Sequence, residues 1–369
     1  MNADHTNNAI RVLFIKTGPD AAELDLIQQL HKRGVYIKVL CWASSSTLEF
    51  LEKENIFIAS VRKRGKVDIP FIRQIRSIVK QFDISLVHAT DSASLANAIW
   101  ATYFTKAKVI AYRGTSARIR KTDPTYWLGT LNPKVSLTFC VSNSVYRYMA
   151  TLLPEHKLRL NYKGFDPAWI KVENPEPSTF PVLPEDRFIG MFLGNSKGRP
   201  HKGLEVLIEA FHRVNDPKSV LIVLGSFSQE SEQLAAKGPA QARIFLMGEV
   251  AKAAEWLCYA NLYIQPSLLK EGLPRSVKEA MALALPIVIT DIPGPTELIE
   301  HEKSGLVVEA GNAAKLAEAW DRMAADPELR QQLGSSAKAR LIEEFSPEVF
   351  VHNTLLAYYD VLKIDANTD

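Results

Sequence analysis

Two glutamates in the second half of the chain, Glu271 and Glu279, flank a sequence typical of a loop followed by a helix start. Pro274 fits the first turn of that helix, because its missing N–H costs nothing there. The amides of Arg275 and Ser276 would then face an anion, since the first turn of a helix has unpaired N–H groups. Carboxylates accept hydrogen bonds from sugar hydroxyls. The spacing therefore predicts a site for a ligand with phosphate in its middle and polyols at both ends, although each glutamate alone would be an ordinary solvated side chain.

A basic loop earlier in the chain offers positive charge for the same ligand. Lys202 stands directly before Gly203, where a helical pattern begins, and Arg199 and Lys197 precede it. Fixed cations on a pyrophosphate neutralise the charge that grows as a leaving group departs, and this can replace a metal ion. The alternative is an ordinary solvated basic turn.

Other nucleotide-binding motifs are absent from the sequence. Neither half has Gly-x-Gly-x-x-Gly after its first strand pattern, and there is no Gly-x-x-x-x-Gly-Lys-Ser/Thr loop. No Asp-x-Asp pair is present, and the eight histidines form no zinc-ligand cluster. We therefore expect neither a cofactor nor a metal site.

Alternating strand and helix patterns must position these residues. Apolar, strand-like runs occur at 11–15, 36–41, 56–61, 86–88, 108–112 and 137–141, and then at 188–193, 220–224, 243–247, 262–264, 286–290 and 306–308. Repeated β–α units predict parallel sheets covered on both faces. The expected fold class is α/β, with two doubly wound, Rossmann-like domains facing each other across a cleft.

A proline-rich stretch between the two series predicts the domain boundary, because closely spaced prolines block both helix and central strand. We expect an N-terminal domain at 1–166, a linker at 167–187, a C-terminal domain at 188–346, and a closing amphipathic helix and tail at 347–369.

The segment from Glu271 to Glu279 resembles the Glu-x7-Glu motif of the retaining glycosyltransferases of family 4, which have the GT-B fold. The resemblance continues over residues 188–362 and is weaker in the N-terminal half, where it rests on the order of the elements. It implies a hexosyltransferase that needs no metal and uses a nucleotide diphosphate sugar. UDP is the commonest donor nucleotide in the family, so we expect a UDP-sugar.

The resemblance also implies roles for individual residues. Glu271 would lie against the donor sugar, Glu279 against the ribose, and Lys202 and Arg199 against the diphosphate, with Lys197 as the alternative second cation. The remaining donor-binding candidates are Gly18, Met247, Gly248, Gly272, Leu273, Pro274, Arg275 and Ser276.

In the N-terminal half the chain departs from the family pattern. The loop after the first strand has one glycine, Gly18, where the family has two, and Arg113 stands where a histidine is common. His88 and Lys163 are further candidates for the acceptor side of the cleft, although a histidine satisfied in the core is the commoner case for His88.

Charge is distributed unevenly along the chain. Residues 1–170 have 24 Lys and Arg against 13 Asp and Glu, and the remainder has 20 against 28. Basic residues gather on and before a helical pattern with apolar residues at 69, 72, 75, 79 and 82: Arg62, Lys63, Arg64, Lys66, Arg73, Arg76 and Lys80, with a second group at Arg118, Arg120 and Lys121. This is either a solvated helix face or a contact surface for anionic lipid headgroups.

Composition narrows the class of protein. Hydrophobic residues make up 47% and charged residues 23%, as in an average soluble domain, and no apolar run is long enough to span a bilayer. The polar N-terminus has no signal-peptide pattern, and Cys41, Cys140 and Cys258 are expected to be reduced core residues. We expect a cytoplasmic protein, peripheral on the inner membrane.

The sequence thus predicts a glycosyltransferase that moves a sugar onto a glycan or lipid-linked glycan in bacterial cell-envelope polysaccharide or lipopolysaccharide synthesis. The alternatives are a nucleotide-sugar epimerase of the same fold and a non-catalytic protein that binds an anionic surface. We expect no nucleic-acid partner, because no cluster of aromatic residues suited to base stacking stands among the basic groups.

Overall fold

The computed structural model describes residues 10–41, 49, 51–59, 65–115, 119–171, 183, 186–269 and 271–364. The chain forms two compact units. Unit 1 consists of residues 1–164 and 347–369, and unit 2 consists of residues 165–346. Most of the expected linker, and Arg62, Lys63, Arg64 and Arg118 of the basic groups, lie outside the described residues.

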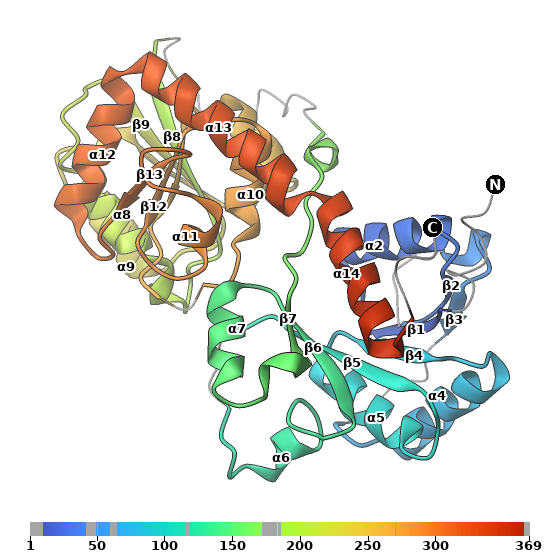
Figure 1. Cartoon of the computed structure of the whole chain (residues 1–369). Helices are drawn as coiled ribbons and strands as arrows, with labels where there is room; N and C mark the ends of the chain where they lie inside the picture. Colours follow the sequence, from blue (N-terminus) through green and yellow to red (C-terminus); the bar gives the residue numbers. More distant parts are fainter. Residues whose placement is uncertain are drawn as a thin grey trace. The chain divides into compact units, whose positions relative to one another are not determined.

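Unit 1 is built on a parallel sheet in the order β3-β2-β1-β4-β5-β6-β7 (Figure 1). Its strands are β1 Arg11–Lys16, β2 Tyr36–Cys41, β3 Phe57–Ala59, β4 Leu86–Ala89, β5 Lys108–Arg113, β6 Val135–Cys140 and β7 Leu158–Leu160. The direction of strand addition reverses at β1, so the topological switch point lies between β1 and β4.

Helices cover both faces of this sheet, because successive strand residues point to opposite sides. They are α2 Ala21–Lys32, α4 Ile69–Gln81, α5 Ser92–Thr102, α6 Pro124–Trp127, α7 Asn143–Ala150 and α14 Pro347–Leu362. Val12 and Phe14 of β1 pack in a core with α2 and α14, whereas Leu13 and Ile15 pack in a second core with α4 and α5. The closing helix therefore completes unit 1 from the far end of the sequence.

Unit 2 repeats the architecture with a parallel sheet in the order β10-β9-β8-β11-β12-β13. Its strands are β8 Phe188–Leu193, β9 Ser219–Leu224, β10 Ile244–Gly248, β11 Leu262–Gln265, β12 Ile287–Thr290 and β13 Leu306–Val308. Its helices are α8 Leu204–Phe211, α9 Gln229–Ala235, α10 Arg275–Ala282, α11 Pro295–Leu298, α12 Ala313–Ala325 and α13 Pro327–Phe345. The switch point lies between β8 and β11. The expected α/β class with two doubly wound sheets is confirmed.

Three details differ from the sequence-based expectation. The three-residue edge strand β7 was missed, since its pattern is too short to distinguish from a loop. Cys258 is exposed rather than in the core, because the 3₁₀ helix that carries it turns this position outward. Pro274 is the residue before the first helical residue of α10, not within its first turn. Among the described residues, no helix is both long and apolar enough to cross a bilayer.

Candidate functional site

A hollow of about 620 Å³ lies at the carboxyl ends of the strands of unit 2. It is bounded by the residues that follow β8, β9 and β10 and by the start of α10. Five residues that the sequence singled out line it together: Lys202, Pro274, Arg275, Ser276 and Glu279. Ligands of doubly wound sheets bind at this edge, beside the switch point.

Lys202 and Glu271 form an ion pair beside the hollow, with Nζ 2.6 Å from Oε1. Lys202 ends a 3₁₀ turn, and Gly203 directly after it has a φ of +73°. A Cβ at this position would stand 1.9 Å from the carbonyl oxygen of Pro266, so only glycine allows the approach. Backbone geometry thus brings the lysine against the loop that carries the glutamate.

A chain of buried and partly buried hydrogen bonds also holds Glu271. Ser267 Oγ donates to Glu271 Oε1 at 3.0 Å, and Gln265 Nε2 donates to Ser267 Oγ at 2.7 Å. Gln265 Oε1 in turn accepts from Tyr263 at 2.7 Å and from Ser276 at 3.2 Å. The amide of Gln265 therefore has one orientation that satisfies all its partners, and it connects the Glu271 loop to the start of α10.

The start of α10 is open to an anion. Its N-cap is Pro274, which provides no side-chain hydrogen bond to the first turn. Glu279 lies one turn further in, only 8% exposed, with Arg275 Nε at 2.9 Å from Oε1. Burial raises the pKa of Glu279, while the Arg275 charge and hydrogen bond oppose the rise. This carboxylate is therefore held partly desolvated at the wall of the hollow.

Other predicted donor-binding residues do not line the hollow. Lys197 and Arg199 are exposed in the turn before Lys202, and neither makes an ion pair with a described residue. Met247 and Gly248 end β10, where the register shifts, and the lining begins with Glu249 instead. Gly272 and Leu273 lie in the loop that leads from Glu271 to α10.

Sequence reasoning missed lining residues that follow the strands: Gly194, Asn195, Gly225, Glu249, Val250 and Lys252. The rule that ligands meet strand carboxyl ends would have found them. Among the described residues, no group of three or more histidine, cysteine, aspartate or glutamate side chains is arranged to hold a metal ion.

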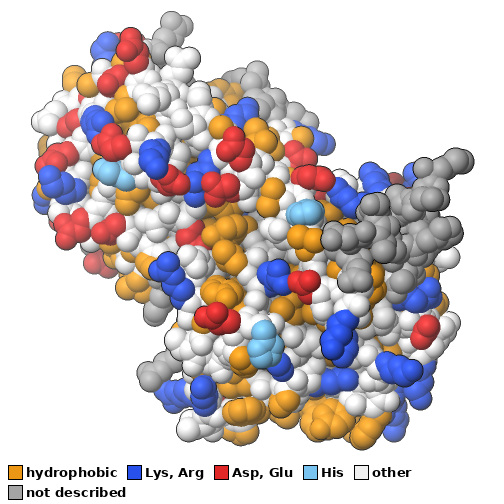
Figure 2. Space-filling model, in the orientation of Figure 1, with side chains coloured by type: hydrophobic (Ala, Val, Ile, Leu, Met, Phe, Trp, Pro, Cys, Tyr) orange, Lys and Arg blue, Asp and Glu red, His pale blue; other side chains and the backbone are white. Residues whose placement is uncertain are grey.

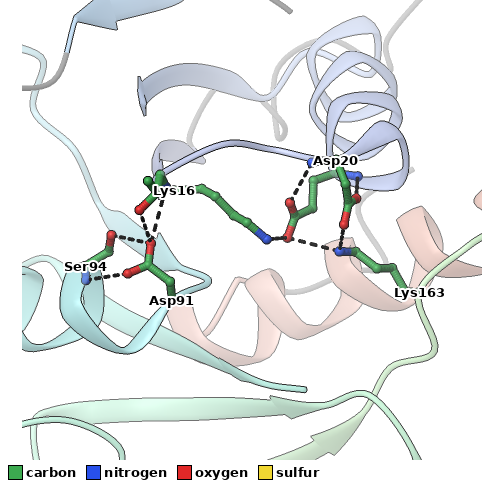
Figure 3. Close-up of polar contacts among 7 residues, drawn as sticks. Lys16, Asp20, Asp91, Ser94 and Lys163 are labelled. Atoms are coloured by element: carbon green, nitrogen blue, oxygen red, sulfur yellow. Dashed lines mark hydrogen bonds and ion pairs between the residues drawn. The ribbon is translucent and has the colours of Figure 1, made fainter. Parts of the chain in front are cut away.

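A charged cluster occupies the carboxyl edge of the sheet in unit 1 (Figure 3). Lys16 Nζ lies 2.7 Å from Glu23 Oε1, and Lys163 pairs with the same oxygen at 3.2 Å and with Asp20. Asp20 and Glu23 also form a capping box on α2, each accepting a backbone N–H of the other. The Asp20 carboxylate has a lowered pKa because the Lys163 charge and hydrogen bond outweigh its burial. Gly18, in the exposed loop before α2, therefore adjoins a helix start that carboxylates already fill.

The two remaining candidates in unit 1 have structural partners. His88 is a core residue rather than a cleft residue: it is 2% exposed, and its Nδ1 lies 2.7 Å from Tyr358 OH. Burial and the Lys16 charge lower its pKa to about 3. Arg113 Nε donates to the carbonyl oxygen of Thr115 at 2.8 Å, and burial lowers the pKa of its guanidinium.

Comparison with known families gives two matches along the chain. The model described as Glycosyltransferase Family 4 matches residues 24–169, and the model described as Glycosyl transferases group 1 matches residues 180–340.

Three curated bacterial proteins illustrate the similarity. An N-acetyl-alpha-D-glucosaminyl L-malate synthase of Bacillus anthracis is 29% identical over 175 residues, which is 47% of this chain and 46% of that protein, so the chain matches about half of its length. The capsular polysaccharide biosynthesis glycosyltransferase CapM of Staphylococcus aureus is 23% identical and covers 86% of this chain and 93% of its own length. A phosphatidyl-myo-inositol mannosyltransferase of Mycobacterium leprae is 23% identical, with 93% of each chain covered.

Solved structures show the same fold. A glycosyltransferase from Rickettsia africae superposes with a TM-score of 0.80 at 19% identity and covers 96% of this chain and 99% of its own. HepE from Anabaena, solved in complex with UDP, gives a TM-score of 0.76 at 18% identity, covering 94% and 99%.

Proposed function

Because this chain belongs to the glycosyltransferases of family 4, we propose that its reaction is the retaining, metal-independent transfer of a sugar from a UDP-sugar to a hydroxyl group of a glycan or lipid-linked glycan. The observation that carries the proposal is the hollow of unit 2, where Lys202, Glu279 and the uncapped start of α10 converge. The donor would bind in this hollow, and the Anabaena protein of the same fold, which was solved in complex with UDP, supports a UDP-linked donor.

Each wall of the hollow suits one part of such a donor. Glu279 would accept hydrogen bonds from the ribose hydroxyls, and the amides of Arg275 and Ser276 would donate to the diphosphate. Lys202 would place one positive charge beside the leaving group. We retain Arg199 as the second cation, because it precedes Lys202 by three residues and its exposed side chain has no ion pair with a described residue.

In the proposed reaction, the acceptor oxygen bonds to the anomeric carbon on the face from which the diphosphate leaves. The bond from that carbon to the phosphate oxygen breaks, and the acceptor proton passes to the departing phosphate. Negative charge therefore grows on the diphosphate, where Lys202 and the helix amides stabilise it. Fixed cations can supply the charge that a divalent metal supplies elsewhere.

Glu271 would orient and stabilise the donor sugar rather than attack it. Its Oε1 already forms an ion pair with Lys202 and accepts a hydrogen bond from Ser267, and both contacts withdraw electron density from the carboxylate. A carboxylate so engaged is a weaker nucleophile, and its other oxygen can still accept a hydrogen bond from a sugar hydroxyl. Glu271→Ala is expected to abolish turnover while the protein remains folded.

Thermal unfolding with UDP, GDP, ADP or CMP, each with and without EDTA, tests the donor site. A ligand at about 100 times its dissociation constant stabilises the folded state by about 2.7 kcal/mol. We expect a shift with UDP that EDTA leaves unchanged and that Glu279→Ala removes. No shift with any nucleotide would contradict the donor site. Release of free UDP together with an epimerised sugar, without an acceptor, would favour the epimerase alternative.

The proposed acceptor belongs to the bacterial cell envelope and is reached at the cytoplasmic face of an anionic membrane. The names of the Staphylococcus and Mycobacterium relatives, a capsular polysaccharide enzyme and a phosphatidylinositol mannosyltransferase, support such an acceptor. The excess of Lys and Arg in residues 1–170 supports an anionic partner for unit 1.

A further inference from the structure

Unit 1 exposes an unusual concentration of large hydrophobic side chains. Among the described residues of the whole chain, six of the eight that are exposed lie within 67–127: Val67, Ile69, Trp100, Tyr103, Phe104 and Trp127. Figure 2 shows hydrophobic side chains gathered over α5 and α6, with Lys and Arg side chains beside them. Contiguous exposed apolar patches rimmed by polar groups mark interaction surfaces.

The centre of the patch is the end of α5. The helix packs its small and apolar residues on the sheet, so Trp100 and the turn after it point outward. The Trp100 and Tyr103 rings stack with centroids 6.1 Å apart, and Phe104 meets Tyr103 edge-on at 5.3 Å. Phe104 is 87% exposed. The three residues form an aromatic tip, a projecting group of rings that contact one another and that solvent surrounds.

A stripe of cations runs beside this tip on α4. Ile69, Arg73, Arg76 and Lys80 are spaced at 4, 3 and 4 residues, which places them on one face of the helix. Arg76 donates to the backbone oxygens of Trp100 and Ala101, at 2.8 and 3.1 Å, and this contact fixes the stripe against the aromatic tip.

The surroundings of the tip contain little opposing charge. Neither α4 nor α5 contains an acidic residue, and Lys106 and Lys108 follow the tip directly. Asp83 and Asp91 are the acidic residues between positions 69 and 113, and Asp91 accepts hydrogen bonds from Ser94 at the far end of α5.

We propose that unit 1 docks on an anionic lipid surface by inserting Trp100, Tyr103 and Phe104 between headgroups while Arg73, Arg76 and Lys80 contact lipid phosphates. Aromatic rings with polar edges prefer the boundary between headgroups and acyl chains. A single-stranded nucleic acid fits less well, because the Trp100 and Tyr103 rings each turn one face toward the other, which leaves fewer faces for bases to stack on. This inference rests on the proposed membrane acceptor and names the element that reaches it. The sequence predicted the basic stripe but not the tip, which lies some 20 residues further along.

Sedimentation of the full chain with vesicles tests the proposal, using phosphatidylcholine alone or mixed with phosphatidylglycerol. We expect binding only to the mixed vesicles, with affinity that falls as salt rises. The double variant Tyr103→Ser/Phe104→Ser is expected to bind about tenfold more weakly. In Arg73→Gln/Lys80→Gln, each lost cation is expected to weaken binding about fivefold. The matched control is Lys338→Gln/Ile342→Ser, which removes one exposed cation and one exposed apolar side chain from α13 and is expected to bind as the parent does.

Equal binding to both kinds of vesicle, or unchanged binding of the tip variant, would overturn the proposal. So would displacement by an oligonucleotide, or a dimer in solution that the tip variant dissociates. The UDP-induced thermal shift separates this inference from the donor site. Tyr103→Ser/Phe104→Ser should retain the UDP-induced thermal shift and bind the mixed vesicles more weakly. Glu279→Ala should lose the thermal shift and bind the vesicles as the parent does.

Discussion

Replacing Glu279 by glutamine is expected to stabilise unit 2 and weaken nucleotide binding at the same time. Burial raises the pKa of this carboxyl, so the folded protein disfavours the charged form despite Arg275. An exposed pair of residues at i and i+4 is worth about 0.3–0.5 kcal/mol, and Arg275 is 68% exposed. Burying an ionised carboxylate costs more than burying a neutral amide, which itself costs about 1–3 kcal/mol in protein mutational data. Removing the charge should therefore leave a net gain of about 1 kcal/mol.

The sign of the pH dependence follows from the direction of the shift. The pKa of the Glu279 carboxyl is higher in the folded protein than in the unfolded chain. Such a group does not reduce folding stability at pH values below its unfolded pKa, and the destabilisation by its charge grows as pH rises through its folded pKa. The increase in the free energy of unfolding that Glu279→Gln produces should thus be complete at pH 7 and vanish toward pH 4. For a unit of this size, about 1 kcal/mol raises the melting temperature by about 2–4 °C.

Nucleotide affinity should move the other way. A hydrogen bond from a ribose hydroxyl to a carboxylate is worth about 1 kcal/mol more than one to an amide, which corresponds to about fivefold in the dissociation constant of UDP. Calorimetric melting with and without UDP, from pH 4 to 8, measures both effects. Arg275→Gln is the opposing control, because it leaves the buried carboxylate without that ion pair and should lower the melting temperature. A lower melting temperature of Glu279→Gln at pH 7, or a gain that persists at pH 4, would refute the reasoning.

Three further predictions concern the polar groups that support the site and the core. Lys202→Met should reduce kcat by at least about 100-fold, since it removes the positive charge beside the leaving group and leaves the poorly exposed Glu271 without its cation. Lys202→Arg should restore part of the rate. Equal kcat values for the two variants in steady-state kinetics would contradict this role of the charge. Gln265→Glu should lower kcat about tenfold with little change in UDP affinity, because it replaces the amide donor to Ser267 by an acceptor. A variant that changes UDP affinity but not kcat would contradict the idea that Gln265 positions Glu271 through Ser267. The low pKa of His88 means that its contribution to stability is complete above pH 6.5 and is lost as pH falls toward 3, by up to about 1.4 kcal/mol per pH unit. In His88→Phe the free energy of unfolding should therefore depend less steeply on pH over this range. Equal slopes in the parent and the variant would exclude this role.

The sequence predicted the strands of both sheets other than β7 because their apolar runs indicate burial directly. Phe188–Leu193 and Ser219–Leu224 are continuous hydrophobic segments, as strands covered on both faces require. The Glu271–Glu279 region was predictable for a different reason: one strand, one loop and one helix place all its members locally. Lys202 lies beside them because Gly203, with its positive φ and no side chain, allows the two loops to approach closely.

Contacts between distant segments could not be predicted in this way. The partner of His88 is Tyr358, 270 residues away, and hydrophobic spacing alone does not say which helix covers a given strand. The aromatic tip escaped notice because Trp100 and Tyr103 fit an ordinary helix end, and only the packing of α4 against α5 reveals that they face outward beside cations. At β10, where the register shifts, the lining begins at Glu249, one position beyond the residues that the strand pattern indicated.

The helix starts at the two switch points differ between the two units in how they would receive the proposed diphosphate. In unit 1 the helices after β1 and β4 begin with Asp20 and Asp91, whose carboxylates accept the first-turn amides. In unit 2 the helices after β8 and β11 begin with Gly203 and Pro274, neither of which offers a capping side chain. A carboxylate at a helix start both fills the donors and repels a phosphate, so the open starts of unit 2 retain the positive end of the helix dipole for a ligand. The residue just before the first turn therefore distinguishes the two kinds of helix start: Asp20 occupies first-turn amides of α2, whereas Pro274 leaves those of α10 open.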